Sequence, residues 1–155
     1  MFVVQKNNTN FDEMHQLVQE SFLLHVAPQY SKEGIDTFLA LIQEDNLKER
    51  AEENTSLFIT ARHHNVIIGV LELRQHSHIT LLFVKDDYRG KGVAFSLLES
   101  AIKRCKNVYP DMKRLTLNAS PNSLHIYKRM GFVETADQQQ NNGVIYTPMK
   151  YVFSD

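Results

Sequence analysis

Apolar side chains recur along this chain with two different periods, and each period predicts a type of secondary structure. From residue 10, they return every three or four positions, and Asn10 stands as a helix cap three residues before Glu13. A second stripe with the same spacing follows Ser31 and predicts another helix. The strongly charged segment 44–54 either continues as helix or forms a loop.

Short runs rich in β-branched and aromatic residues predict strands. The three clearest are residues 56–61, 66–73 and 79–84, separated by polar turn segments at 63–65 and 74–77. They predict an antiparallel meander. The remaining expected elements are a strand at 2–5, a helix at 92–106, a strand at 115–118, a helix at 122–130, and a closing hairpin of 132–135 with 144–151.

This order of elements predicts an α+β fold, in which about seven mostly antiparallel strands form a mixed central sheet flanked by four helices. The helix at 92–106 joins two strands as a crossover, so these strands should be parallel and the crossover right-handed. A length of 155 residues without a Pro/Gly/Ser-rich linker indicates one domain over residues 1–155.

Composition excludes several classes of protein. One cysteine, Cys105, cannot form a disulfide framework within the chain, and its place on an apolar helix stripe predicts a buried side chain. No apolar run approaches the ~20 residues of a membrane helix, and the first ten residues lack a signal-peptide pattern. We therefore expect a cytoplasmic chain without a membrane partner.

Charge is unevenly distributed although the net charge is only −1. Residues 1–55 carry four Lys or Arg against ten Asp or Glu, whereas residues 85–129 carry ten against four. Such a division predicts that the basic part meets an anionic ligand and the acidic part a cationic one. Solvated helix faces would give the same counts.

The most informative segment joins the strand that ends at Val84 to the helix that begins near Gly92. Gly90 and Gly92 allow the sharp turn that lets amide groups converge at a helix start, a geometry that binds phosphate. The segment has no P-loop string, and Phe95 stands where a dinucleotide motif has its third glycine. A plain glycine turn without a ligand remains an alternative.

Two stretches resemble the GNAT superfamily of acyl-CoA-dependent N-acetyltransferases. RGKGVA at 89–94 fits the signature Arg/Gln-x-x-Gly-x-Gly/Ala, and SPNSLHIYKRMGF at 120–132 is similar to the family's second stretch, with Tyr127 before Gly131 and Phe132. The order of elements also resembles that of the family. The resemblance implies a GNAT-like sheet that splays between its fourth and fifth strands, with acetyl-CoA as the co-substrate.

The resemblance also implies where the cofactor lies. Pantetheine would pair with backbone groups of one strand and the pyrophosphate would rest on the amides of the glycine loop. Ser120 stands where many members have Asn, which implies a weaker or rearranged contact near pantetheine. Further contacts are expected from Asn122 and Lys128. The strand positions are Leu82, Phe83 and Val84, and the loop positions are Arg89, Gly90, Lys91, Gly92, Val93 and Ala94.

For the reaction, the resemblance implies direct attack of a primary amine on the thioester, with an oxyanion donor among the backbone N–H groups near residues 82–83. Tyr127 would protonate the leaving thiolate, although it could simply pack on its helix. The base is either His78 or Glu72, and His78 could also be an ordinary strand residue. His76 and His78 lack a third ligand at a sensible spacing, so no metal is expected.

Partners are less defined by the sequence. The acidic first third coincides with helices that wall the acceptor pocket in relatives, so we expect a cationic small-molecule or protein amine. We expect no nucleic-acid partner. Family members are often homodimers, and the sheet-edge hairpin at 146–151 is one candidate contact for a homodimer. The alternatives are a non-catalytic acyl-CoA-binding sensor and an adaptor with a degenerate loop. The candidate acidic residues are Glu20, Glu33, Asp36, Glu44 and Asp45.

Overall fold

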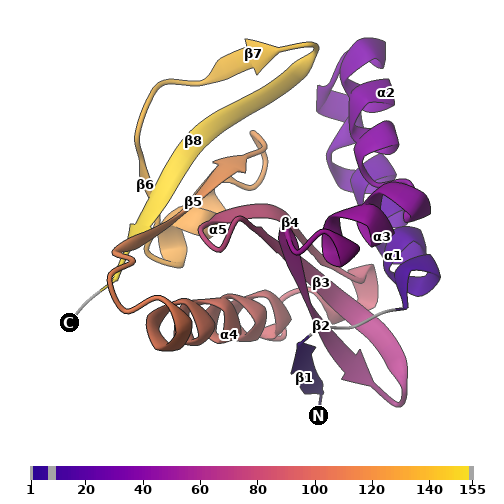
Figure 1. Cartoon of the computed structure of the whole chain (residues 1–155). Coiled ribbons are helices and arrows are strands. Elements are labelled where there is room, and N and C mark those ends of the chain that lie inside the picture. Colours follow the sequence, from indigo (N-terminus) through magenta and orange to yellow (C-terminus); the bar gives the residue numbers. More distant parts are fainter. Residues whose placement is uncertain (1, 7–9, 154–155) are drawn as a thin grey trace.

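The computed structural model describes residues 2–6 and 10–153 and has the predicted mixed α+β architecture (Figure 1). Asn10 and Ser31 cap the first two helices as predicted, each through a side-chain oxygen that accepts a backbone N–H. The helices are α1 (Phe11–His25), α2 (Lys32–Leu41), α3 (Glu44–Glu52), α4 (Val93–Val108) and α5 (Leu124–Arg129), with 3-10 turns η1 (Ala27–Gln29) and η2 (Asp86–Tyr88). The strands are β1 (Val3–Lys6), β2 (Ser56–His63), β3 (Val66–Arg74), β4 (His78–Val84), β5 (Arg114–Ala119), β6 (Val133–Glu134), β7 (Gln139–Asn141) and β8 (Val144–Val152).

The sheet has the order β1-β2-β3-β4-β5-β8-β6, with β7 paired to β8. Neighbouring strands are antiparallel except β4 and β5, which are parallel as the crossover predicts. Two elements exceed the prediction, because the charged segment forms the separate helix α3 and residues 139–141 pair as β7. The hairpin that contains residues 146–151 lies at the edge of the sheet as expected, because β8 pairs with β5 on one side and with the outer strands β6 and β7 on the other.

Helices cover both faces of the sheet, so its central strands are buried on both sides. On β2, Leu57 and Ile59 belong to the core beneath α4, whereas Phe58 between them packs in the core beneath α1. This alternation follows from the two-residue period of a strand. Cys105 of α4 is buried in the first of these cores, as predicted.

A β-bulge in β4 explains why the sheet opens beside that strand. Glu72 pairs with Leu81 and Leu73 with Ile79, so Thr80 is an extra residue without a partner on β3. Bulges bend a strand and increase its local twist. β4 pairs with β5 only at His78 and Ile79, and the two strands separate from Thr80 onward. The predicted splay between the fourth and fifth strands is therefore confirmed.

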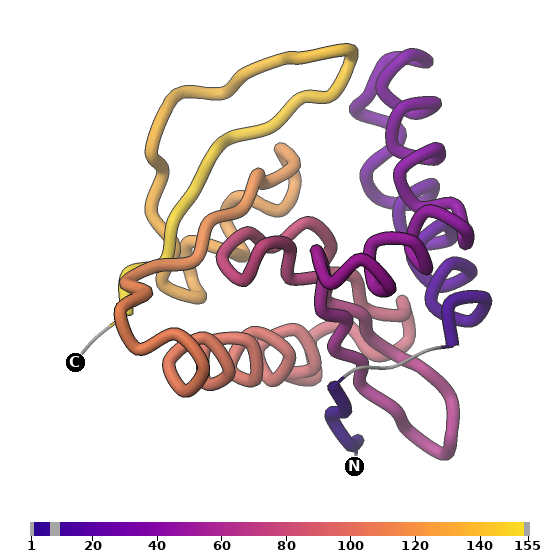
Figure 2. The backbone as a smooth tube through the Cα atoms, in the orientation of Figure 1, coloured from indigo at the N-terminus to yellow at the C-terminus, as the bar shows by residue number. Residues whose placement is uncertain are grey.

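Besides the short β4–β5 pairing, a second contact joins the β5, β8 and β6 part of the sheet to the rest of the protein, between the β7–β8 hairpin and α2. The hairpin of β7 and β8 turns at Asn142 and Gly143, both at positive φ, and its tip reaches the start of α2 (Figure 2). A Cβ on Gly34 would lie 2.2 Å from the carbonyl oxygen of Gly143. A Cβ on Gly143 would lie 2.0 Å from the Ser31 hydroxyl oxygen. Backbone therefore lies against backbone here, and we call this contact between Gly34 and Gly143 the glycine contact.

Gly143→Ala should lower the free energy of unfolding more than Gly90→Ala, which is a matched control. Both glycines have a φ near +80°, so both variants pay the left-handed strain of about 1–2 kcal/mol. A Cβ at Gly90 would meet nothing within 4 Å, whereas one at Gly143 would collide with backbone. The collision should add about 1–3 kcal/mol. Urea unfolding measures the difference, and equal losses in the two variants would contradict the close contact.

Candidate functional site

The loop between β4 and α4 has the geometry expected for binding phosphate. Gly90 and Gly92 have φ of +77° and +84°, and a Cβ on either would meet nothing within 4 Å. Gly92 is the N-cap of the 16-residue helix α4 and provides no side-chain cap, so the first amides of α4 are not bonded by it. The positive end of the helix dipole points into the same open space.

This loop lines a cavity of about 330 Å³ that lies between α1, β4, α4 and α5. Nine of the predicted cofactor residues line it, together with Tyr127. The structure therefore brings the strand edge, the glycine loop and the candidate acid to one place. The nine residues are Leu82, Phe83, Val84, Arg89, Gly90, Gly92, Val93, Ala94 and Asn122.

The two predicted lysines do not line this cavity. The ammonium of Lys91 lies 5.5 Å from the centre of the Tyr88 ring, and Lys128 is ion-paired with Glu134 at 2.6 Å. Arg129 lines the cavity instead of Lys128. Consecutive helix residues point about 100° apart, so a shift of one position along α5 changes which cation faces the ligand.

Helix α1 contributes a wall of the cavity that no sequence motif predicted. Ser21, His25 and Val26 line the cavity, and the Ser21 hydroxyl donates to the carbonyl oxygen of Val84 at 3.4 Å. Asn122 donates its side-chain N–H to the His25 carbonyl oxygen at 2.6 Å. Asn122 thus joins the segment before α5 to the end of α1 across the cavity wall.

Ser120, which replaces the Asn of many family members, bonds within its own turn. Its hydroxyl lies 3.0 Å from Oδ1 of Asn122 and 2.9 Å from the hydroxyl of Ser123. It therefore orders the segment that leads into α5. The predicted weaker contact to pantetheine stays a prediction.

Tyr127 sits on α5 with its ring held by the glycine and phenylalanine that follow it. The buried ring of Phe132 contacts that of Tyr127 edge-on at 5.7 Å between centres. Gly131 has a φ of +104°, and a Cβ there would lie 2.9 Å from the Tyr151 ring. Burial raises the pKa of Tyr127 to about 12 because the phenolate would be poorly solvated. The phenol therefore keeps its proton at neutral pH.

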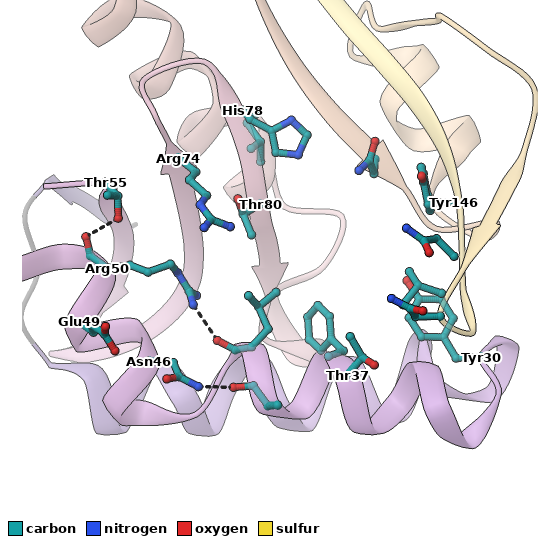
Figure 3. A pocket seen from close by; sticks show the side chains of 18 of the residues that line it. Tyr30, Thr37, Asn46, Glu49, Arg50, Thr55, Arg74, His78, Thr80 and Tyr146 are labelled. Atoms are coloured by element: carbon teal, nitrogen blue, oxygen red, sulfur yellow. Dashed lines mark hydrogen bonds between the residues drawn. The ribbon is translucent and has the colours of Figure 1, made fainter. Parts of the chain in front are cut away.

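A second cleft, of about 760 Å³, lies along the first half of β4 (Figure 3). His78 and Thr80 line it from β4, whereas Leu82 and the residues after it line the smaller cavity. Its walls are α2, α3, the ends of β3 and β5, and the tip of the β7–β8 hairpin. Further lining residues are Tyr30, Thr37, Asn46, Glu49, Arg50, Glu53, Arg74, Asn118, Asn141 and Tyr146.

His78 faces this cleft at the closed end of the gap, where β4 still pairs with β5. Its Nδ1 lies 2.8 Å from the hydroxyl oxygen of Thr116. Burial, and then the nearby charge of Arg74, lower the pKa of His78 below its usual 6.5. The neutral imidazole, which can accept a proton, is therefore the main form at pH 7.

Glu72 lies elsewhere and its surroundings argue against its interpretation as the base. Its side chain is 0% exposed, and its two oxygens accept from Nε and Nη2 of Arg50 at 2.7 and 3.0 Å. The Ser56 hydroxyl also donates to it. Arg50 is on α3 and Glu72 on β3, so this buried ion pair fixes α3 to the sheet.

The five acidic residues predicted to face an acceptor do not line the large cleft. Glu20 and Glu44 line other surface hollows. The acidic residues that line the cleft are Glu49 and Glu53 of α3. The charge pattern of residues 44–54 is compatible with both helix and loop, so it does not predict which face of α3 turns to the cleft.

Two structural observations concern other classes of site. Within residues 2–6 and 10–153, no three His, Cys, Asp or Glu side chains are grouped so as to hold a metal ion. The helices of the same ranges are too short or too polar to cross a membrane.

A family model described as an acetyltransferase (GNAT) domain matches residues 26–153. The match includes the glycine loop, Tyr127 and strand β4, which lines both cavities. The chain therefore belongs to the GNAT acetyltransferase family. No match to the sequence is found among curated proteins.

Solved structures of similar fold cover almost the whole chain. One is the PaiA N-acetyltransferase from Thermoplasma acidophilum in complex with coenzyme A, with a TM-score of 0.80, 20% identity, and 99% of each chain covered. A GCN5-related N-acetyltransferase from Rhodopseudomonas palustris has a TM-score of 0.78 and 21% identity over 97% of this chain and 95% of its own. The spermidine N-acetyltransferase from Vibrio cholerae, in complex with CoA and spermine, has a TM-score of 0.68 and 16% identity, with 97% of this chain and 95% of its own covered. At these identities the likeness shows the fold.

Proposed function

We propose that this protein is an acetyl-CoA-dependent N-acetyltransferase that moves an acetyl group to a primary amine by direct attack. One observation carries the proposal: the unpaired edge of β4 after the Thr80 bulge leads to the glycine loop, and Tyr127 lines the same cavity. An amine acceptor would enter the larger cleft on the first half of the same strand.

The chain's groups fit the three parts of acetyl-CoA. On the side away from β3, residues 82–84 of β4 pair with no strand of the described ranges and offer backbone groups to pantetheine, as an added strand would use them. The open turn at Gly90 and Gly92 and the amides of α4 offer donors to the pyrophosphate. Arg89 and Arg129 line the cavity and supply positive charge.

The acceptor amine must be neutral before it attacks, so a group in the cleft has to take its proton. His78 is neutral at pH 7 and lines the cleft. It lies four residues before Leu82, roughly 13 Å along the strand at about 3.3 Å per residue. His78 would therefore receive the proton through intervening solvent rather than directly. Backbone N–H groups near Leu82 would bond the carbonyl oxygen as its negative charge grows.

Tyr127 would donate a proton to the thiolate as it leaves. Its raised pKa keeps the phenol protonated over the neutral and moderately alkaline range, so the donor is present whenever the reaction occurs. The ring contact with Phe132 holds the phenol in place on α5. No described residue hydrogen-bonds the Tyr127 hydroxyl, which leaves it free to meet the sulfur.

Thiol release from acetyl-CoA, followed with a colorimetric thiol reagent across a library of amines, tests the proposal. We expect release only when an amine is present, together with a mass increase of one acetyl group on that amine. Calorimetric titration with acetyl-CoA accompanies the assay. Binding without release for any amine would favour the acyl-CoA sensor, and absence of binding would favour an adaptor.

A further inference from the structure

Arg74 lines the larger cleft and has no side-chain partner among residues 2–6 and 10–153. It is the last residue of β3 and pairs across the sheet with His78, so both side chains lie on one face of the sheet. Figure 3 shows Arg74, His78 and Thr80 directed into the same space. Among the described residues, no acceptor hydrogen-bonds its guanidinium and no carboxylate pairs with it.

The other arginine of the cleft differs from Arg74 in this respect. Arg50 gives Nε and Nη2 to Glu72 and Nη1 to the carbonyl oxygen of Leu41 at 2.9 Å. Its charge is balanced and its donors are used within the protein. The five N–H donors of Arg74 are available to a ligand, and a planar guanidinium matches a carboxylate through two parallel hydrogen bonds.

Thr80 gives an independent sign that a polar ligand group belongs here. Its hydroxyl oxygen is buried and has no hydrogen-bond partner in the described part of the chain. Such an atom costs about 1–3 kcal/mol when left unbonded. Thr80 is the bulged residue, and it lines the cleft together with Arg74. A carboxylate oxygen beside Arg74 would give this hydroxyl an acceptor.

The part of the cleft that α3 forms carries negative charge. Glu49 and Glu53 of α3 line it, and neither forms an ion pair with a described residue. The cleft thus presents one unpaired cation near β4 and two unpaired anions on α3. A purely cationic acceptor would have to approach Arg74, whereas a molecule with both charges would find a complement to each of them within the cleft.

We propose that Arg74 binds a carboxylate of the acceptor, so that the substrate is an amine that also carries a carboxylate, such as an amino acid. This inference rests on the proposed function, because it names the acceptor class of that site. Thr80 and Leu82 are two residues apart, about 7 Å along a strand. A carboxylate held beside Thr80 therefore leaves the amine of a small amino acid within reach of the thioester near Leu82.

Acceptor pairs that differ only by the carboxylate test the inference. L-Lysine is compared with 1,5-diaminopentane and L-phenylalanine with 2-phenylethylamine, in the thiol-release assay, for the wild type and Arg74→Gln. The wild type should prefer the carboxylate member of each pair. Arg74→Gln should lower kcat/KM for that member roughly 10- to 100-fold, the value of a charged hydrogen bond, and change the other member less than about threefold.

The control variant is Arg114→Gln, which removes an exposed arginine of β5 that lines neither cavity. This variant should leave kcat/KM unchanged for both acceptors of each pair. Equal losses for both members in Arg74→Gln, or a wild-type preference for the amine without a carboxylate, would overturn the inference and leave the proposed function standing.

A binding readout separates this inference from the chemistry. Without acetyl-CoA, L-lysine should shift the imidazole NMR signals of His78, and 1,5-diaminopentane should shift them much less. The shift should be lost in Arg74→Gln. If L-lysine shifts these signals in an Arg74-dependent way but no amine is acetylated, the proposed function is overturned and the carboxylate site stands. Equal shifts with the two ligands, or none with L-lysine, would overturn the inference.

Discussion

Tyr127→Phe should lower kcat about 100- to 1000-fold while the affinity for acetyl-CoA stays unchanged. The substitution removes a hydroxyl and keeps the ring that packs against Phe132. A positioned general acid contributes typically 10²–10⁴-fold. Single-turnover thiol release gives the rate, and calorimetric titration gives the affinity.

A matched control for this variant is Tyr109→Phe, because Tyr109 lines neither cavity. Its kcat should equal that of the wild type. The pH profile adds a second check: with a pKa of about 12, the phenol stays protonated below that pH, so its ionisation should produce no fall in kcat between pH 7 and 10. An unchanged kcat in Tyr127→Phe would show that another group protonates the thiolate.

Arg50→Met should give the largest loss of stability of the substitutions considered, about 3–5 kcal/mol in the free energy of unfolding. The variant leaves the fully buried carboxylate of Glu72 without its two hydrogen bonds from the Arg50 guanidinium. It also frees the carbonyl oxygen of Leu41 at the end of α2. Urea unfolding followed by circular dichroism measures the change.

Two further variants show whether the loss comes from the unpaired charge. The double variant Arg50→Met/Glu72→Leu removes both charges and should be more stable than Arg50→Met, since a buried ion pair can be replaced by apolar residues at little cost. Lys103→Met breaks an exposed pair with Glu99 at 4.0 Å and should cost less than about 1 kcal/mol. A double variant as unstable as Arg50→Met would contradict the charge-based explanation.

Local patterns predicted most of the fold. The caps Asn10 and Ser31, the β-branched runs and the single crossover each depend on neighbouring residues, and the structure confirms all of them. The strand β7 was missed although Asn142 and Gly143 form the Asn-Gly pair typical of two-residue hairpins. The short polar strand before them has no apolar alternation that could have marked it.

The cavity that we propose for the cofactor could be predicted because its lining is largely built from contiguous residues. The strand end, the glycine loop and the helix start follow one another in sequence, so a motif describes them. The acceptor side brings together α3, β3, β4 and the β7–β8 tip, which only tertiary packing places side by side. No sequence pattern therefore places Arg74, Glu49 and Glu53 in this cleft. For the same reason the sequence does not show that Arg50 pairs with Glu72, the residue predicted as a candidate base.

The glycine contact has a consequence for how wide the acceptor cleft stays. Only His78 and Ile79 of β4 pair with β5. The part of the sheet built from β5, β8 and β6 is therefore joined to β4 by a short stretch of pairing. A second attachment, where Gly34 of α2 meets Gly143 of the β7–β8 turn, fixes the angle between β4 and the part of the sheet that holds β5 and β8. The width of the cleft that we propose for the acceptor is thus set by two attachments, the β4–β5 pairing and the glycine contact, and it depends on two residues without side chains.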